Sequence, residues 1–166
     1  FTETVQALDP ESGHLRAVET ERICEVDCAL RWGIGYDAQL ESFVNIIATP
    51  KGGTHVAGFE QAVLKVLRSQ VDKNARKLKV SAKDGRPEKD DVLAGMTAVV
   101  TVRFPEPQFE GQTKEILGTP QIRTVVARVV GDWLESKFAS SKRDDKQQTS
   151  ALLEKVVGEM KARVSA

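Results

Sequence analysis

Alternating apolar and polar residues in the first third of the chain predict β-strands. One face of the segment 22–32 is formed by Cys24, Val26, Cys28, Leu30 and Trp32. The residues between them are mostly charged, and this period of two is typical of a half-buried strand. Turn signals at residues 9–13 and 33–37 separate this segment from its extended neighbours. The first third is therefore predicted to be a β-meander.

Beyond residue 54 the apolar residues recur at helical spacing. The pattern predicts two long amphipathic helices, one from His55 and one that starts at Pro120. Thr54 and Thr119 are the expected N-cap residues. The predicted apolar stripes are Phe59, Val63, Val66, Leu67, Val71 and Leu78 in the first helix, and Ile122, Val125, Val126, Val129, Trp133, Leu134 and Phe138 in the second. We expect the two helices to pack side by side on one face of a sheet.

The remaining segments differ in how many apolar side chains they could bury in a core. Residues 96–104 are rich in Val and Thr and predict a central, well-buried strand. Residues 79–91 are polar and predict a mobile loop, and residues 140–150 predict an exposed connection. A last helix, with the stripe Leu153, Val156, Val157, Met160 and Val164, is expected either to dock back or to lead towards another domain.

Composition narrows the class of protein. The chain has 166 residues and 18.2 kDa, which favours one domain with a short appended element. Its 24 basic and 24 acidic side chains give no overall attraction to nucleic acid or membrane. No apolar run is long enough for a bilayer and no secretory signal is seen, so we expect a cytoplasmic protein. Because it begins with Phe1, we expect it to be part of something longer.

The cysteines and histidines do not predict a metal or redox site. Along a strand, Cys24 and Cys28 would be about 13 Å apart, which is too far for a disulfide. They are therefore predicted to be small core-facing side chains. His14 and His55 have no carboxylate or Cys at ligand spacing, and we expect both to be polar loop or cap residues.

The segment PEPQFEGQTKEILG, residues 105–118, is the candidate for chemistry. Pro105 and Pro107 lack backbone donors, so they should end the preceding strand and direct the loop outward. Gly111 allows a sharp reversal that presents Gln112, Thr113 and Lys114 at the tip. A charge-assisted hydrogen bond from the lysine ammonium to an anionic oxygen raises affinity or rate by about ten- to a hundredfold. From composition alone, a solvated loop lysine is the favoured alternative, and GQTKE lacks the spacing of a complete phosphate-binding loop.

Two longer segments resemble a known family. SFVNIIATPKGGTHVAGF and LAGMTAVVTVRFPEPQFEGQTKEILG are similar to the transducer domain of bacterial type IIA DNA topoisomerase B subunits, meaning those of DNA gyrase and topoisomerase IV. The resemblance implies an α+β two-layer sandwich of ribosomal-protein-like fold, with a roughly four-stranded sheet, helices on one face and a left-handed βαβ crossover. It implies a transducer domain over residues 1–139. Residues 140–166 would be a connection and the start of a linker helix towards a Toprim domain.

The same resemblance implies how the loop acts. Lys114 would contact the γ-phosphate of ATP in a GHKL-type ATPase domain of the same polypeptide, and Gln112 would assist. Lys114 is thus the expected catalytic residue, and both residues are expected to bind the cofactor. Hydrolysis would release the contact and let the domains rotate, which passes the signal to the DNA gate.

The resemblance also implies cofactors and partners. ATP and Mg²⁺ are expected in the intact B subunit and no cofactor on this chain alone, which should neither hydrolyse ATP nor break DNA. The implied partners are a second B subunit, the topoisomerase A subunit and double-stranded DNA, with no membrane. Gyrase and topoisomerase IV are not separated by this segment, although FVNIIATPKGGTHVAGF favours the topoisomerase IV B subunit or a related actinobacterial-type enzyme.

Two other functions remain as alternatives. A stand-alone nucleic-acid-binding module needs a basic face with aromatic residues for stacking, but aromatics make up only 5% of the chain. A small-molecule kinase needs its own glycine-rich phosphate loop. Basic residues that could meet DNA phosphates are Lys65, Arg68, Arg76, Lys77, Lys79, Lys142 and Arg143, but a solvated, charge-balanced surface is favoured for them.

Overall fold

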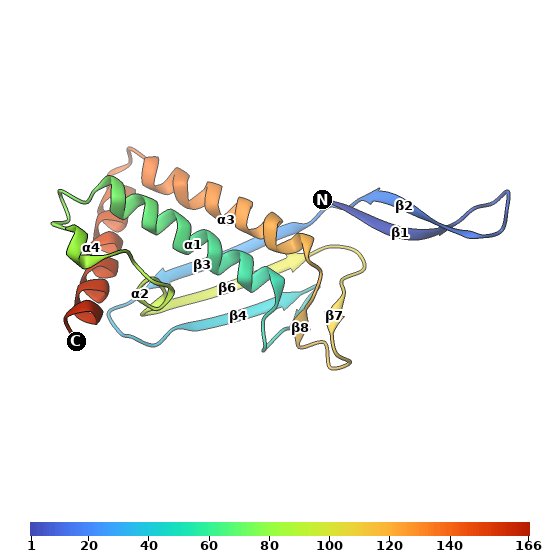
Figure 1. The fold of residues 1–166 in the computed structure, drawn as a ribbon, viewed down its shortest axis with the longest axis horizontal. Coiled ribbons are helices and arrows are strands. Elements are labelled where there is room, and N and C mark those ends of the chain that lie inside the picture. The colour runs from blue at the N-terminus through green and yellow to red at the C-terminus, as the bar shows by residue number, and fades with distance from the viewer.

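A mixed four-stranded sheet, covered on one face by two long helices, forms the body of the computed structural model, which describes residues 1–166 (Figure 1). The strand order is β3-β6-β4-β5, with β3 antiparallel and β4 parallel to β6. The α+β two-layer sandwich expected from the sequence is confirmed. The elements of this body are β3 (Glu25–Trp32), β4 (Gln39–Val44), β5 (Ile47–Ala48), α1 (Thr54–Lys73), β6 (Met96–Arg103) and α3 (Gln121–Ala139).

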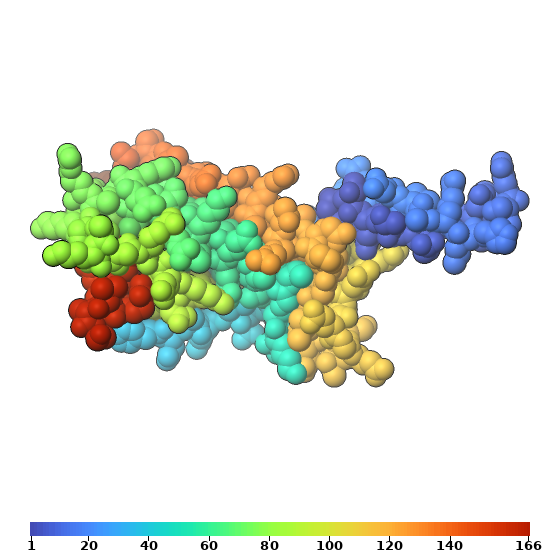
Figure 2. Space-filling model, viewed as in Figure 1, coloured from blue at the N-terminus to red at the C-terminus, as the bar shows by residue number.

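The predicted β-meander is wrong. β6 lies between β3 and β4, and the first two strands, β1 (Thr2–Leu8) and β2 (Leu15–Glu21), form a separate antiparallel hairpin. Figure 2 shows this hairpin as an arm that extends from the body. Alternation along a strand says which face is buried but not which strand is its neighbour. The more apolar β6 takes the central position that sequence order would have given to β3 or β4.

β6 is central, as predicted, but it is buried on one face only. Met96, Val100 and Val102 are fully buried, whereas Val99 on the opposite face is 39% exposed. The reason is that α1 and α3 cover a single face of the sheet. The parallel connection from β4 to β6 runs through α1, and its left-handed sense stays a prediction.

The two predicted helices pack against each other, and most residues of the expected apolar stripes are buried or half-buried, but Val129 and Trp133 of α3 are 43% and 41% exposed. Their fully buried residues include Phe59, Val63, Leu67, Ile122 and Val126. Leu78 lies beyond the end of α1, which is shorter than predicted.

Neither helix is capped as predicted. Gly53 occupies the cap position of α1, and the hydroxyl of Thr54 is buried without a hydrogen-bond partner. The hydroxyl of Thr119 instead accepts a hydrogen bond from the Gln108 amide at 2.9 Å. Thr119 therefore stabilises the segment before α3 and leaves the first turn of the helix uncapped.

Two segments predicted to be irregular contain helices. The 79–91 stretch holds a 3₁₀ turn, η1 (Ala82–Asp84), and the start of α2 (Lys89–Leu93). The predicted connection at 140–150 is mostly exposed but helical from Arg143, where α4 (Arg143–Ser165) begins. The division of the chain at residue 139 stays a prediction. None of the helices has the length and hydropathy that a membrane crossing requires.

The last helix docks back on the body. Leu153, Val156 and Met160 of α4 are buried. Near its end, Arg163 Nε lies 3.1 Å from each carboxylate oxygen of Asp91, a residue of α2 that is only 5% exposed. Apolar packing and the ion pair between the exposed Arg163 and the buried Asp91 thus hold α4 against the α1–β6 connection.

A buried polar network joins the sheet to the start of α1. His55 is fully buried, so its predicted role as a loop or cap residue is wrong. Its Nε2 lies 3.0 Å from the Thr49 hydroxyl, which lies 2.7 Å from the hydroxyl of Ser42 in β4. Burial lowers the pKa of His55 from 6.5 to about 4, so the imidazole is neutral at pH 7.

The buried imidazole makes stability depend on pH. His55 takes up a proton near pH 6.5 in the unfolded chain but only near pH 4 in the folded one. The free energy of unfolding should therefore fall from about pH 6.5 to about pH 4, by up to about 1.4 kcal/mol per pH unit from this group. Urea unfolding of His55→Gln should show a shallower pH dependence than the wild type. His14→Gln, at an exposed turn, is the control, and equal slopes for His55→Gln and wild type would contradict the assignment.

Candidate functional site

The segment between β6 and α3 leaves the main sheet and forms a small hairpin of its own, called here the 105–118 hairpin. Its strands, β7 (Phe109–Glu110) and β8 (Ile116–Leu117), pair antiparallel with each other. Figures 1 and 2 show the segment projecting at the end of the body where β4 finishes. The sequence prediction that the two prolines end the strand and send the loop outward is consistent with this arrangement.

The two predicted site residues lie at the tip of this hairpin. Gln112 and Lys114 are exposed, and neither makes a hydrogen bond or ion pair within the chain. Gly111 and Lys114 have positive φ angles of 81° and 57°, and these left-handed residues turn the chain at the tip. The ammonium and the amide are therefore free to bind an anionic group from outside the chain.

The base of the hairpin is hydrogen-bonded to the segment that precedes α1. The Leu117 amide donates to the Gly52 carbonyl at 3.0 Å, and the Lys51 amide donates to the Glu115 carbonyl at 3.2 Å. Lys51 Nζ also pairs with the Glu115 carboxylate at 3.0 Å. Leu117 itself is 1% exposed. An unpartnered tip is thus mounted on a base that belongs to the core.

Gly53 makes this contact possible because it has no side chain. It pairs with Leu117 in a parallel bridge at a φ of 134°. A Cβ at this position would lie 2.3 Å from the Leu117 carbonyl oxygen and 2.4 Å from its nitrogen. The absence of a side chain at Gly53 is therefore required for the close approach of the hairpin.

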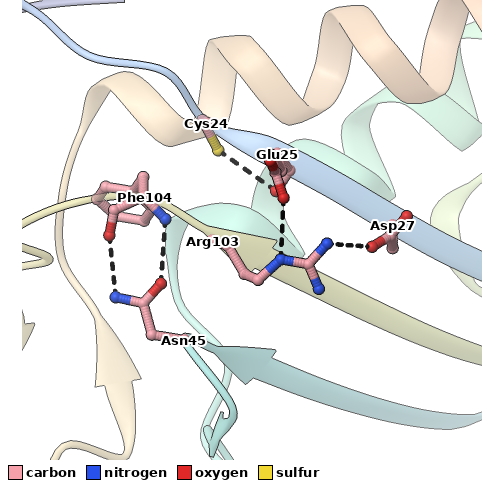
Figure 3. A network of polar contacts seen from close by, with 6 residues as sticks. All are labelled: Cys24, Glu25, Asp27, Asn45, Arg103 and Phe104. Atoms are coloured by element: carbon pink, nitrogen blue, oxygen red, sulfur yellow. Dashed lines mark hydrogen bonds and ion pairs between the residues drawn. The ribbon is translucent and has the colours of Figure 1, made fainter.

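A second set of polar contacts holds the start of the hairpin (Figure 3). The Asn45 side chain donates to the Phe104 carbonyl at 2.9 Å and accepts from the Phe104 amide at 3.0 Å. One residue earlier, Arg103 donates to Glu25 at 3.0 Å and to Asp27 at 2.9 Å. Sequence reasoning missed Asn45, since only the fold brings it beside the residue that precedes Pro105.

The two cysteines are structural, as predicted. Cys28 lies in β3 and Cys24 just before it, and both are half-buried and free. Burial raises the pKa of Cys24 to about 11 and also raises the pKa of Cys28, so both thiols are protonated at pH 7. No group of three or more His, Cys, Asp or Glu side chains is arranged to hold a metal ion.

The candidate basic residues are spread over the surface and do not share one patch with the hairpin. Arg68 is engaged within the chain, because its Nε donates to the Pro87 carbonyl at 2.6 Å. The other six are found in α1, in the turn that follows it and around the start of α4: Lys65, Arg76, Lys77, Lys79, Lys142 and Arg143. A contact of these residues with DNA stays a prediction.

A groove of about 840 Å³ lies between β3, α3 and α4, away from the hairpin. Its charged side chains are largely paired, with Lys137 on Asp145 at 3.5 Å and Lys155 on Glu159 at 3.4 Å. The apolar lining comes from residues such as Trp32, Trp133 and Leu152. The groove holds no arrangement of nucleophile and base.

The whole chain matches a known family. The sequence model described as DNA gyrase B covers residues 2–166. The chain belongs to the DNA gyrase B family. Among curated relatives, the DNA gyrase B subunit of Treponema denticola is 36% identical over 166 residues, which is 100% of this chain and 25% of the relative. The gyrase B subunit of Streptomyces coelicolor is 40% identical over 126 residues, covering 73% of this chain and 18% of the relative.

Solved structures of gyrase B and topoisomerase IV proteins share the fold. The 43K ATPase domain of Thermus thermophilus gyrase B, in complex with an aminocoumarin, aligns with a TM-score of 0.74 at 27% identity, over 99% of this chain and 39% of the other. The topoisomerase IV ATP-binding domain of Francisella tularensis aligns with a TM-score of 0.70 at 27% identity, over 85% of this chain and 37% of the other. This gyrase B family chain therefore spans a quarter or less of these curated relatives and under half of these solved chains.

The close approach at Gly53 gives a direct test of how the hairpin is mounted. Gly53→Ala should displace the hairpin base and lower the melting temperature, because the added Cβ would clash with Leu117 backbone atoms that cannot rotate away. Hydrogen exchange should then show faster exchange of the Leu117 and Gly118 amides. Gly35→Ala is the control, since a Cβ there meets nothing within 4 Å. Equal effects of the two substitutions would contradict the proposed mounting.

Proposed function

We propose that this chain is the transducer part of the B subunit of a bacterial type IIA DNA topoisomerase. In this proposal, Lys114 and Gln112 contact the γ-phosphate of ATP held by an ATP-binding domain of the same polypeptide. One observation carries it: two unpartnered, exposed polar side chains stand at the tip of a hairpin whose base is hydrogen-bonded to the core. Membership of the gyrase B family supports the general function.

The chemistry of the tip fits a terminal phosphate. Lys114 supplies up to three N–H donors and a full positive charge, and Gln112 supplies amide donors. Neither side chain is engaged within the chain, so neither has to break an internal contact before it binds. Together they fit a few phosphate oxygens and not a whole nucleotide, so ATP and Mg²⁺ would be held by the neighbouring domain. The γ-phosphate supplies the negative charge, and cleaving it removes the contact.

The mounting of the hairpin suggests how such a contact is transmitted. Hydrogen bonds join Leu117 to Gly52 and Phe104 to Asn45, which connects the hairpin to α1 and to the sheet. Because α4 also packs on this body, a force on the tip would move α4 as well. In the proposal, α4 leads towards a Toprim domain. The second B subunit, the A subunit and double-stranded DNA complete the enzyme.

A stand-alone nucleic-acid-binding module is not favoured. Acidic and basic side chains balance at 24 each, and several basic side chains are already paired with carboxylates. Such a module would present an uncompensated basic face.

Replacement of Lys114 tests the proposal in the intact B subunit assembled with its A subunit. Lys114→Ala should slow ATP turnover and ATP-dependent strand passage by about ten- to a hundredfold, the worth of a charge-assisted hydrogen bond in the reaction. DNA cleavage without nucleotide should stay near the wild-type level, because that step does not use the γ-phosphate.

Lys146→Ala provides the matched control for the loss of one exposed lysine. Lys146 lies in α4 and makes no ion pair, so this variant should keep wild-type turnover. ATP turnover by Lys114→Ala at the level of Lys146→Ala would remove the proposed role of the loop.

A further inference from the structure

The β1–β2 arm and the 105–118 hairpin leave the body at the same end, where β6 finishes (Figure 1). Side chains at their bases join them. The Phe1 ring packs edge-to-face against the ring of Phe104, with 5.9 Å between the ring centroids. The Arg22 amide donates to the Phe1 carbonyl at 2.8 Å, which closes the base of the arm. Since Phe104 directly precedes the hairpin, the base of the arm is packed against the start of the hairpin.

Arg22, at the base of the arm, links two carboxylates. Its Nη2 lies 3.2 Å from Oε2 of Glu106 in the hairpin, and its Nε lies 3.4 Å from Oε2 of Glu3 in β1. The Arg22 side chain is only 15% exposed, and Glu3 is buried. Glu3 Oε2 has no hydrogen-bond partner, so the Arg22 guanidinium is the charge that compensates it. Glu3 therefore holds Arg22 in place for its contact with Glu106.

Glu106 has a backbone conformation that does not suit it. Its φ angle is 55°, in the left-handed region, and it stands between Pro105 and Pro107. A residue other than glycine is strained there, and a following proline restricts the residue further, towards extended conformations. Such strain persists only where the surroundings hold it. The Glu106 side chain is 71% exposed, and its one ion-pair partner is Arg22.

The surroundings of Arg22 explain how an exposed glutamate can be held. An ion pair between two mobile surface side chains contributes little, because both lose freedom when they pair. Here the arginine is already fixed by Glu3 and mostly buried, so only the glutamate is ordered on pairing. The contact can therefore offset part of the strain at Glu106.

We propose that Arg22 is a positioning residue that clamps Glu106 in its left-handed conformation and so sets the direction in which the hairpin presents Lys114. This rests on the proposed function, in which Lys114 must reach the same phosphate in every cycle. Asn45 fixes Phe104, and Gly53 receives the other end of the hairpin at Leu117. The clamp supplies the constraint on the residues between these two attachments. Without it Glu106 relaxes towards an extended conformation, and the tip samples a wider range of positions.

Hydrogen exchange in the intact B subunit, without nucleotide, tests the clamp itself. Arg22→Gln should speed exchange of the Gln108 and Gly118 amides several-fold, because their acceptors, the Thr119 hydroxyl and the Gln108 carbonyl, lie just beyond Glu106. Arg86→Gln is the matched control, since Arg86 pairs with Asp72 at 3.3 Å outside the hairpin and the arm. Exchange of the two amides in Arg22→Gln no faster than in the control would overturn the clamp.

Glu106→Ala breaks the same ion pair from its exposed end, so it tests the clamp without a change in the buried Glu3–Arg22 contact. Alone, it should speed exchange of the same two amides. In the Arg22→Gln background it should have no further effect, because the contact is already lost. A further increase as large as the one in the wild-type background would show that the two residues act independently, and the inference would fall.

ATP turnover shows whether the clamp acts through Lys114. In the intact B subunit assembled with its A subunit, Arg22→Gln should lower kcat several-fold, and DNA cleavage without nucleotide should be unchanged. In the Lys114→Ala background, Arg22→Gln should lower kcat no further, because no lysine remains to be positioned. An equal fall in both backgrounds would assign Arg22 to general stability and would rule out its positioning role.

The clamp and the phosphate contact can fail separately. Wild-type turnover by Lys114→Ala, together with faster exchange in Arg22→Gln, would remove the phosphate contact and leave the clamp on the hairpin standing. Slowed turnover by Lys114→Ala, with unchanged exchange in Arg22→Gln, would remove the clamp alone.

Discussion

The position of the 105–118 hairpin depends on one backbone approach, between Gly53 at the start of α1 and Leu117 at the base of the hairpin. The two segments are so close that no Cβ fits at Gly53. This contact joins the loop to the helix that covers the sheet, while the buried Leu117 side chain fills the core beneath it. Without the approach of Gly53 to Leu117, the hairpin would be a loop that is not anchored to the core. A contact at its tip could then not move the body of the domain.

The hairpin combines a rigid base with an unpartnered tip. Asn45 holds its start and the Gly52–Gly53 segment holds its end, yet Gln112 and Lys114 have no partner in the chain. This division is what a relay requires, because the tip must exchange its contact as the ligand changes and the base must not.

The sequence predicted features that depend on local chemistry. The apolar stripes of α1 and α3, the centrality of β6 and the outward turn after Phe104 each follow from periodicity or from prolines within a few residues. Prediction from the sequence failed for contacts between segments that are far apart along the chain. The insertion of β6 between β3 and β4 and the burial of His55 against Thr49 are set by tertiary packing, which local alternation does not encode. The hairpin was recognised through its motif, but its attachment through Asn45 had no signal in the sequence.

The central claim is that Lys114 leaves its own fold to reach a phosphate bound next door, and a structure of the intact B subunit with a non-hydrolysable ATP analogue tests it most directly. We predict Lys114 Nζ within about 3.2 Å of a γ-phosphate oxygen, with the hairpin base unchanged. A lysine left in solvent while the γ-phosphate is held entirely by other residues would contradict this claim.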